Sequence, residues 1–309
     1  MTRVTIVEIE GCMASSAAIT HDVMATANQI SGTSKRALPF GVTTIRCGPR
    51  RNSGKLRGTD LVIVPGLGTA SVDRLEEKLG GPACRRAGDL LVEAFEAGAA
   101  LAASCASTFL LGETGLLDGR RATTTWWLAP FFRQLYPQVQ LDESRMLVPT
   151  GQVVTAGAAL AHLDLALWIL RQHSPSLANL VAHYLMIDER PSQAAYVISD
   201  HLAHADPLIE RFERWARARL AKGFSLTEAA RSVGASERTL ARHLHRVLGK
   251  TPLSYFQDLR IEHAVHRLQT GTASVDSIAS EVGYADGVTL RTLLRRKLGR
   301  GVRELRGRG

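Results

Sequence analysis

Apolar and polar positions alternate in blocks over the first two-thirds of the chain. Short runs rich in apolar residues predict strands at 4–8, 41–47, 61–64, 99–104 and 153–157. Stretches with helical spacing lie between them and predict helices over 22–30, ending at 90–97, and over 160–172. Strands that are buried on both faces read as apolar runs, whereas half-exposed strands alternate. The pattern therefore predicts an α/β domain in which helices cover both faces of a parallel sheet.

The last hundred residues follow a helical pattern instead. Near-helical spacing of apolar residues predicts a helix over 208–223, carried by Leu208, Phe212, Trp215 and Leu220. Ser225 and Glu228 have the spacing of a capping box at the start of the next helix. Gly234 supplies a turn, and Ser236 can cap the helix that follows. Two short helices joined by a tight glycine turn form a helix-turn-helix.

This helix-turn-helix pattern occurs twice. The Val-Gly pairs at 233–234 and 282–283 lie 49 residues apart, and the Leu-Gly pairs at 248–249 and 298–299 lie 50 apart. Asp286 stands where a cap of the second recognition helix is needed. The residues from 252 to 270 predict one long helix between the two units. Such a helix would place two recognition helices about one DNA turn apart on one face.

Charge separates the same two regions. The whole chain has a net charge of +9, yet residues 208–309 carry 20 Lys and Arg against 10 Asp and Glu, a net of +10. Residues 1–207 carry the remaining 18 basic and 19 acidic residues, a net of −1. A basic excess confined to one region favours a polyanionic partner for that region. We predict double-stranded DNA.

Composition excludes several other classes of protein. No apolar run approaches the roughly 20 residues that cross a bilayer, and the first ten residues do not resemble a signal peptide. Cys12, Cys47, Cys84 and Cys105 show no C-x-x-C spacing, which indicates free thiols in a reducing cytoplasm. The sequence also shows no P-loop, GxGxxG or metal-binding constellation, so we expect no cofactor and no metal.

The C-terminal region resembles the AraC family. The segments L-G-K-T-P-L-S-Y, R-I-E-H-A and I-A-S-E-V-G-Y carry the resemblance. It implies base contacts from Arg238, Ala241 and Arg242 in the first unit and from Gly287, Thr289, Arg291 and Thr292 in the second. We expect phosphate contacts from Arg246, Lys250, Arg295 and Arg296. The run G-R-G-V-R-E-L-R lacks the proline usual in the family, so we expect a looser final turn.

The N-terminal region resembles the class I glutamine amidotransferase-like (PfpI-type) domain, which has a flavodoxin-like fold. The segments L-V-I-V-P-G-L-G, S-C-A-S-T-F-L-L-G and T-A-G-x-x-L-A-H-L-D carry the resemblance. Cys105 follows an apolar strand and opens a helix, so we expect it at a strand-to-helix elbow above the sheet. A helix N-terminus at that place is expected to lower the pKa of the thiol.

Catalysis at Cys105 is not expected. Hydrolytic relatives place His directly after the Cys, where this chain has Ala106, and an acid where it has Ser16. Without a base the thiol lacks an activating partner. We instead predict a pocket for a small nitrogenous or amino-acid-like metabolite, formed by Ser16, Gly66, Cys105, Ala106, Trp126 and His162. A cysteine hydrolase or glyoxalase with His21 or His162 as base, and a thiol redox sensor, remain the alternatives.

The predicted organisation has three parts. A sensor and dimerisation domain occupies 1–190, a linker 191–207 and the DNA-binding domain 208–309. The predicted function is a cytoplasmic, homodimeric transcription regulator that binds a specific DNA sequence and is controlled by an effector bound above Cys105.

Overall fold

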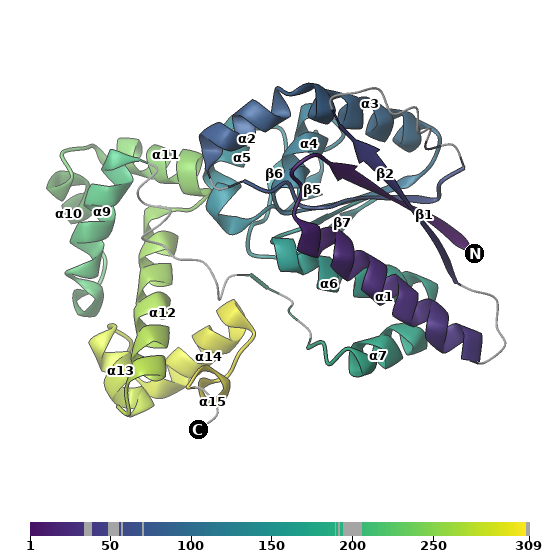
Figure 1. The fold of residues 1–309 in the computed structure, drawn as a ribbon. Helices are drawn as coiled ribbons and strands as arrows, with labels where there is room; N and C mark the ends of the chain where they lie inside the picture. The colour runs from purple at the N-terminus through teal and green to yellow at the C-terminus, as the bar shows by residue number, and fades with distance from the viewer. Residues whose placement is uncertain are drawn as a thin grey trace. The chain divides into compact units, whose positions relative to one another are not determined.

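The computed structural model describes residues 1–33, 39–48, 56, 58–69, 71–188, 190, 192–193 and 206–306. The chain divides into two compact units, Met1–Gln193 and Ala194–Gly309. Figure 1 shows a sheet layered between helices in the first unit and a purely helical second unit.

Unit 1 is built on a mostly parallel sheet. Among the described residues, six strands follow the order β2-β1-β3-β4-β8-β7. They are β1 (Thr2–Ile9), β2 (Phe40–Cys47), β3 (Leu61–Val64), β4 (Ala100–Ser104), β7 (Leu147–Thr150) and β8 (Val153–Ala156). All neighbouring pairs are parallel except β7 and β8. The antiparallel edge strand β7 is an addition to the parallel sheet that the sequence predicts.

Successive side chains of the central strands enter opposite cores. Along β3, Leu61 and Ile63 belong to one hydrophobic cluster, whereas Val62 and Val64 belong to the other. This alternation is the strand period of two, with both faces buried. It explains why the strand reads as a continuous apolar run in the sequence.

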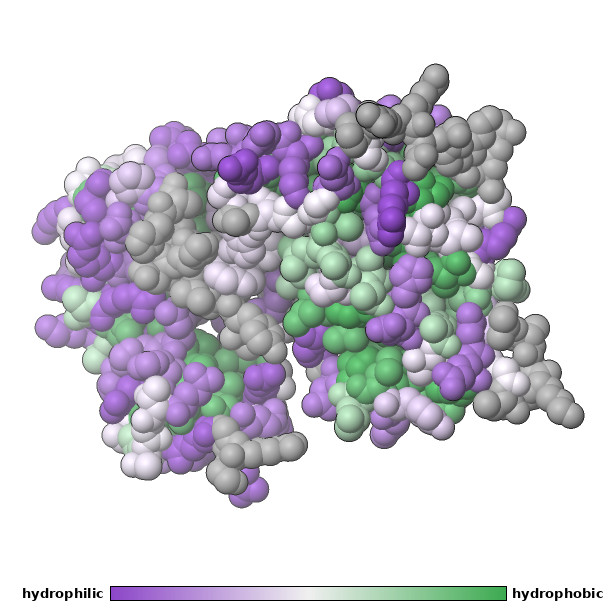
Figure 2. All heavy atoms as spheres, viewed as in Figure 1, coloured by the Kyte–Doolittle hydropathy of each residue, from purple (hydrophilic) through white to green (hydrophobic). Residues whose placement is uncertain are grey.

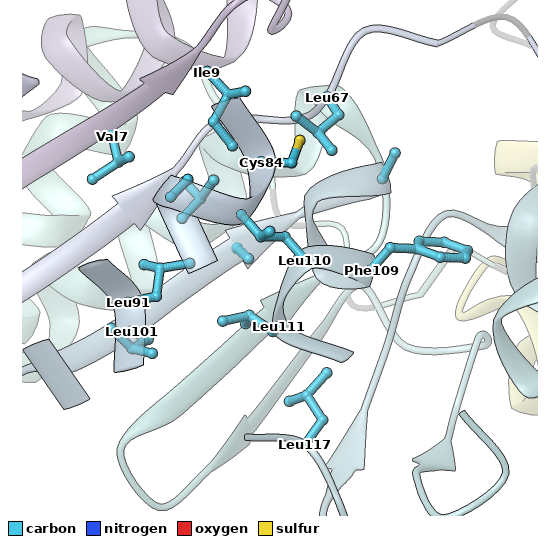
Figure 3. Packing of buried hydrophobic residues seen from close by; sticks show 14 of the residues in the cluster. Val7, Ile9, Leu67, Cys84, Leu91, Leu101, Phe109, Leu110, Leu111 and Leu117 are labelled. Atoms are coloured by element: carbon cyan, nitrogen blue, oxygen red, sulfur yellow. The ribbon is translucent and has the colours of Figure 1, made fainter. Parts of the chain in front are cut away.

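Helices cover each face of the sheet. The first face is covered by α2 (Val72–Leu79), α3 (Pro82–Glu96), α4 (Thr108–Glu113) and α5 (Ala129–Leu135). The second is covered by α1 (Ala14–Thr33), α6 (His162–His173) and α7 (Pro175–Tyr184). Figure 3 shows side chains of α3 and α4, among them Leu91 and Phe109, packed in the first core. A small separate sheet joins β5 (Arg121–Ala122) and β6 (Gln140–Leu141).

Two helix boundaries differ from the prediction by more than three residues. Helix α1 begins at Ala14 rather than at Asp22. Its first two turns contain one large apolar residue, Ile19, among Ala, Ser, Thr and His, so no helical spacing of large apolar residues marks them. In unit 2 the first helix ends at Arg217 rather than at Gly223, because a separate 3₁₀ turn follows at Leu220–Lys222.

Unit 2 consists of two helix-turn-helix pairs joined by a long helix. The first pair is α10 (Leu226–Ser232) with α11 (Glu237–Leu248), preceded by α9 (Pro207–Arg217). Helix α12 (Pro252–Thr270) leads to the second pair, α13 (Val275–Glu281) and α14 (Gly287–Leu298). Each pair has its own buried leucines, Leu240 and Leu244 in the first and Leu290 and Leu294 in the second.

Backbone geometry explains the repeat of Gly residues. Gly234 and Gly283 have φ of 70° and 77° in the turns, and Gly249 and Gly299 have φ of 65° and 69° after the recognition helices. A Cβ is unfavourable in this left-handed region, so glycine is needed at all four places. The spacing of 49 and 50 residues thus reflects the same two backbone bends, present in two copies.

The helix ends are capped largely as expected. Ser236 Oγ accepts from Thr239 N, and Asp286 Oδ1 accepts from Thr289 N. The capping box is only half present: Ser225 Oγ accepts from Glu228 N, but the Glu228 carboxylate pairs with Arg219. A short helix α15 (Val302–Leu305) is the last helix that the structure describes, and Leu305 is buried against the second pair. The final turn is therefore packed, contrary to the expectation of a looser one.

Most of the predicted linker lies outside the described residues. At its start, Gln193 is buried in unit 1, where its side chain is hydrogen-bonded. At its end, Asp206 caps α9, and Pro207 is the first residue of that helix. Residues 193, 206 and 207 thus belong to the folded units rather than to the connection between them.

Candidate DNA-binding surface and effector site

Helix α11 presents polar side chains on the face opposite its buried leucines. Arg238, Arg242 and Arg246 are exposed, and Ala241 is half-buried between them. Arg238 and Arg242 are four residues apart, so they share one helix face. This arrangement suits a helix in the major groove, where guanidinium groups bind guanine and a methyl group can contact thymine.

Helix α14 repeats the arrangement with other side chains. Thr289, Arg291, Thr292, Arg295 and Arg296 are exposed. Gly287 differs from them, because it is buried and its N–H donates to Asp276 Oδ1 at 2.9 Å. A Cβ at that position would lie 2.6 Å from the same oxygen. Gly287 therefore allows close packing of α13 and α14.

One exposed apolar residue at this surface was not predicted. Val288 is 66% exposed in the first turn of α14, and its carbonyl accepts from Thr292 Oγ1 at 3.0 Å. Its methyl groups suit contact with a thymine methyl. The sequence offered a signal, since an apolar residue directly after the N1 glycine falls outside the leucine spacing of the helix.

Lys250, a predicted phosphate contact, is already paired with a carboxylate. Its Nζ lies 2.9 Å from Asp258 Oδ2 of α12. Lys297 of α14 reaches the other oxygen of the same carboxylate at 2.6 Å. Asp258 thus holds one lysine from each helix-turn-helix pair, and contact with phosphate would compete with these ion pairs.

In unit 1, Cys105 lies directly after β4 and opens a 3₁₀ turn, Cys105–Ser107. Its φ is 55°, an uncommon value for a residue other than glycine. The expected strand-to-helix elbow is therefore present. A strained backbone of this kind costs on the order of 1–3 kcal/mol and clusters at functional sites.

Ser16 and Gly66 meet at Cys105. A Cβ added to Gly66 would lie 3.2 Å from Cys105 Cβ and 3.4 Å from Ser16 Oγ. The hydroxyl of Ser16 donates to the Ala159 carbonyl at 3.3 Å. The structure thus brings together three residues that are far apart in the sequence, and Gly66 leaves the space between the other two.

Burial is the largest influence on the pKa of the Cys105 thiol. Burial raises its pKa, since only 8% of the residue is exposed. Hydrogen bonds from the Ala106 backbone, the Thr125 side chain and the Ala159 backbone act in the opposite direction without overcoming burial. The expected lowering by a helix N-terminus is therefore wrong, because desolvation of the thiolate dominates.

His162 begins α6 and is fully buried. Thr20 Oγ1 donates to the Ser16 carbonyl at 3.0 Å, so it can only accept from His162 Nδ1, 3.2 Å away. Among the described residues none bonds to Nε2. Burial lowers the pKa of His162 to about 4, so the ring is neutral at pH 7.

The remaining predicted site residues are Ala106, Trp126 and His21. Ala106 is fully buried after Cys105, and Trp126 is half-buried at the start of the 3₁₀ turn Trp126–Leu128. His21 Nε2 lies 3.0 Å from Thr44 Oγ1, and it lines a cavity of about 820 Å³ between α1 and β2 that Cys105 does not line. The described residues include no cluster of three or more metal-ligating side chains. Nor do they include a helix long and apolar enough to span a membrane.

Comparison with known proteins gives a family for each unit. Residues 54–172 match the DJ-1/PfpI family, and residues 214–308 match a helix-turn-helix domain family. The chain joins a DJ-1/PfpI domain to an AraC-type helix-turn-helix domain. This agrees with the two resemblances and with the fold expected for each part of the chain.

Two of the curated relatives align with a large part of this chain. The chain is 27% identical over 194 residues to the HTH-type transcriptional regulator ArgR of Pseudomonas aeruginosa, covering 62% of this chain and 59% of that protein. It is 27% identical over 161 residues to a protein of Streptomyces lividans described as an AraC-like transcription regulator, covering 48% and 53%. The matches thus span little more than half the length of these relatives.

A solved structure supports the fold of one part. The structure of a protein of Vibrio parahaemolyticus described as a transcriptional regulator matches 60% of this chain and 98% of its own, with a TM-score of 0.50 and 18% identity. At this identity the similarity concerns the fold alone.

Proposed function

We propose that this protein is a transcription regulator that binds a specific sequence of double-stranded DNA through α11 and α14. The observation that carries the proposal is the repeated pair of capped recognition helices, each with exposed arginines on the face away from its leucine core. The basic excess of residues 208–309 adds the electrostatic attraction that DNA binding requires. Relatives named as transcriptional regulators agree with this assignment.

We further propose that a small metabolite binds beside Cys105 and controls DNA binding. The donors that face the thiol are two backbone N–H groups and one hydroxyl, from Ala106, Ala159 and Thr125. Such donors suit a carboxylate, so an amino-acid-like effector fits the chemistry of the site. The strained elbow at Cys105 also favours a functional role for this place.

A regulatory role is favoured over catalysis. A nucleophilic Cys needs a base or a lowered pKa, whereas burial raises the pKa of Cys105. The groups that act on the thiol are all neutral, and no histidine or carboxylate of the described residues is among them. The same raised pKa argues against a redox sensor, because oxidation proceeds through the thiolate.

A cytoplasmic homodimer completes the proposal. Figure 2 shows an apolar region on the visible face of unit 1, whereas the visible face of unit 2 outside the grey atoms is mainly hydrophilic. Met13, Ala14 and Ala18 are exposed apolar residues at the start of α1. Pairing through unit 1 would cover apolar surface and leave the basic unit for DNA.

The test of DNA recognition is selection from a random duplex library by the full-length protein. We expect a site with two blocks about 10 base pairs apart, one for each recognition helix. Arg242→Ala should weaken binding to the selected site by about 1–3 kcal/mol and relax preference at one base. Arg214→Ala removes the same charge from an exposed ion pair on α9 and serves as the control. Equal losses on selected and random DNA for Arg242→Ala would contradict base recognition by α11.

A further inference from the structure

The end of unit 1 is fastened to the elements that surround Cys105. We define the strap as its last described residues, Arg190, Ser192 and Gln193. The Ser192 hydroxyl and the Gln193 N–H both donate to the Ser144 carbonyl, at 2.8 and 3.0 Å. Residues 194–205 follow directly and connect the strap to the DNA-binding unit.

Gln193 connects the strap to Cys105 through one residue. Its Nε2 donates to the Thr124 carbonyl at 2.9 Å. The hydroxyl of Thr124 in turn donates to the Cys105 carbonyl at 3.0 Å. Gln193 is only 1% exposed and Thr124 is fully buried, so water does not interrupt this path.

Arg190 makes a second connection on the other side of the site. Its guanidinium donates to the Leu160 carbonyl at 2.8 Å and to Asp164 Oδ2 at 2.6 Å. Leu160 follows Ala159, whose backbone reaches both the Cys105 thiol and the Ser16 hydroxyl. Thr125, the other partner of the thiol, likewise follows Thr124. Thr125 and Ala159 thus contact the thiol from outside the 3₁₀ turn of Cys105. The strap binds the chain neighbour of each, Thr124 and Leu160.

Within the part of the chain that the structure describes, the hydrogen bonding of the Gln193 side chain is incomplete. Its NH₂ group has two hydrogens but faces three acceptors, the Thr123 hydroxyl at 3.2 Å and the carbonyls of Thr124 and Arg145 at 2.9 and 3.2 Å. Its buried Oε1 has no donor among the described residues. A buried acceptor without a partner disfavours the bound state. The Gln193 side chain is therefore well enclosed yet imperfectly satisfied, as a contact that must open would be.

We infer that Gln193 and Arg190 are positioning residues that couple the Cys105 site to the DNA-binding unit, with release of the strap as the conformational change. The inference rests on the proposed function for its meaning. A ligand that displaces Thr125 or Ala159 would shift Thr124 or Leu160 and loosen the strap. Each strap residue that is released lengthens the covalent connection between the units by up to about 3.5 Å. Coupling is reciprocal, so release of the strap must also change access to Cys105.

The experiment measures alkylation of the full-length protein by iodoacetamide, with each cysteine followed by peptide mass spectrometry. Gln193→Ala should raise the rate at Cys105 about 3- to 10-fold, because Thr124 and Thr125 lose their support. Cys47 and Cys84 are buried in unit 1 away from the strap and report general loosening. Gln152→Ala, which removes a glutamine that bonds the Gly98 carbonyl, is the matched control and should leave every rate unchanged.

A second variant keeps the test valid if Gln193→Ala fails to fold. A Cβ at Gly157 would lie 2.6 Å from three side-chain atoms of Gln193, so Gly157→Ala should displace Gln193 without removing it. The same rise at Cys105 alone is expected. An unchanged rate at Cys105 in both variants, or an equal rise at Cys47 and Cys84, would overturn the inference.

The affinity of the same protein variants for the selected duplex tests whether the strap also affects DNA binding. A changed affinity in Gln193→Ala but not in Gln152→Ala supports it, whereas altered thiol reactivity with unaltered affinity overturns the link to unit 2. Failure of the proposed function looks different: the unmodified protein itself would select no DNA sequence, while the alkylation rates would still report on the strap.

Discussion

At the scale of single residues, His162 links the stability of unit 1 to pH. Its ring is neutral in the folded protein, where burial lowers the pKa to about 4, and titrates near 6.5 in the unfolded chain. Between these values the unfolded state binds the proton and the folded state does not. The free energy of unfolding should therefore fall as pH decreases from about 6.5 to 4.

We expect a loss of about 2 kcal/mol between pH 7.5 and pH 5 from this residue alone. His162→Gln should flatten this part of the pH profile, even though it lowers stability at pH 7.5. His183→Gln, at an exposed histidine of α7, is the matched control and should retain the wild-type slope. The measurement is denaturant unfolding followed by tryptophan fluorescence at both pH values. A slope equal in all three proteins would show that His162 is protonated in the folded state or paired by water.

At the scale of elements, Asp258 joins the two helix-turn-helix pairs. It is one acidic residue on the long helix α12, and it binds a lysine from the end of each recognition helix. Asp258→Asn should free both lysines for phosphates. Each added phosphate contact steepens the dependence of log affinity on log salt by about 0.9.

Fluorescence anisotropy over a series of salt concentrations measures that slope. We expect the slope to steepen by up to the amount that two added phosphate contacts give, with tighter binding at low salt. Glu304→Gln removes the same charge from an exposed position on α15 and should leave the slope nearly unchanged. A wild-type slope in Asp258→Asn, together with lower thermal stability, would instead show that both lysines only brace α12.

Elements with a strong local signal could be predicted from the sequence. Apolar strands such as 61–64, the four turn glycines and the caps Ser236 and Asp286 depend on short-range physics, and the structure has them all. The elbow at Cys105 belongs to the same group. Each of these features needs only a few neighbouring residues to be specified.

Pairings between distant residues were not predictable in this way. The contact of Asp258 with Lys297, the burial that raises the Cys105 pKa and the anchoring of Gln193 all depend on residues that lie far apart in the chain. The start of α1 was missed for a related reason, since its small residues Ser16 and Thr20 are buried against a segment that lies far away in the sequence. Tertiary packing decides such features, and local periodicity does not record it.

At the scale of the whole molecule, the two units have separate hydrophobic cores and different charge. The clusters of unit 1 lie around the sheet, and the cluster of the second helix-turn-helix pair contains residues of unit 2 only. Separate cores of this kind unfold as separate cooperative transitions. The basic excess lies in residues 208–309, so DNA should stabilise the transition of unit 2.

Calorimetry of the full-length protein should therefore show two transitions that respond to different conditions. Selected duplex DNA at a hundred times its Kd should stabilise unit 2 by about 2.7 kcal/mol. An effector from a panel of amino acids, amines and betaines should raise the transition of unit 1, which is also the one that His162 makes sensitive to acid. Because the strap would connect the two sites, DNA and effector together should shift the transitions by more or less than the sum of their separate effects. Strictly additive shifts would mean that the two units bind their ligands independently, and control of DNA binding by the effector would then be excluded.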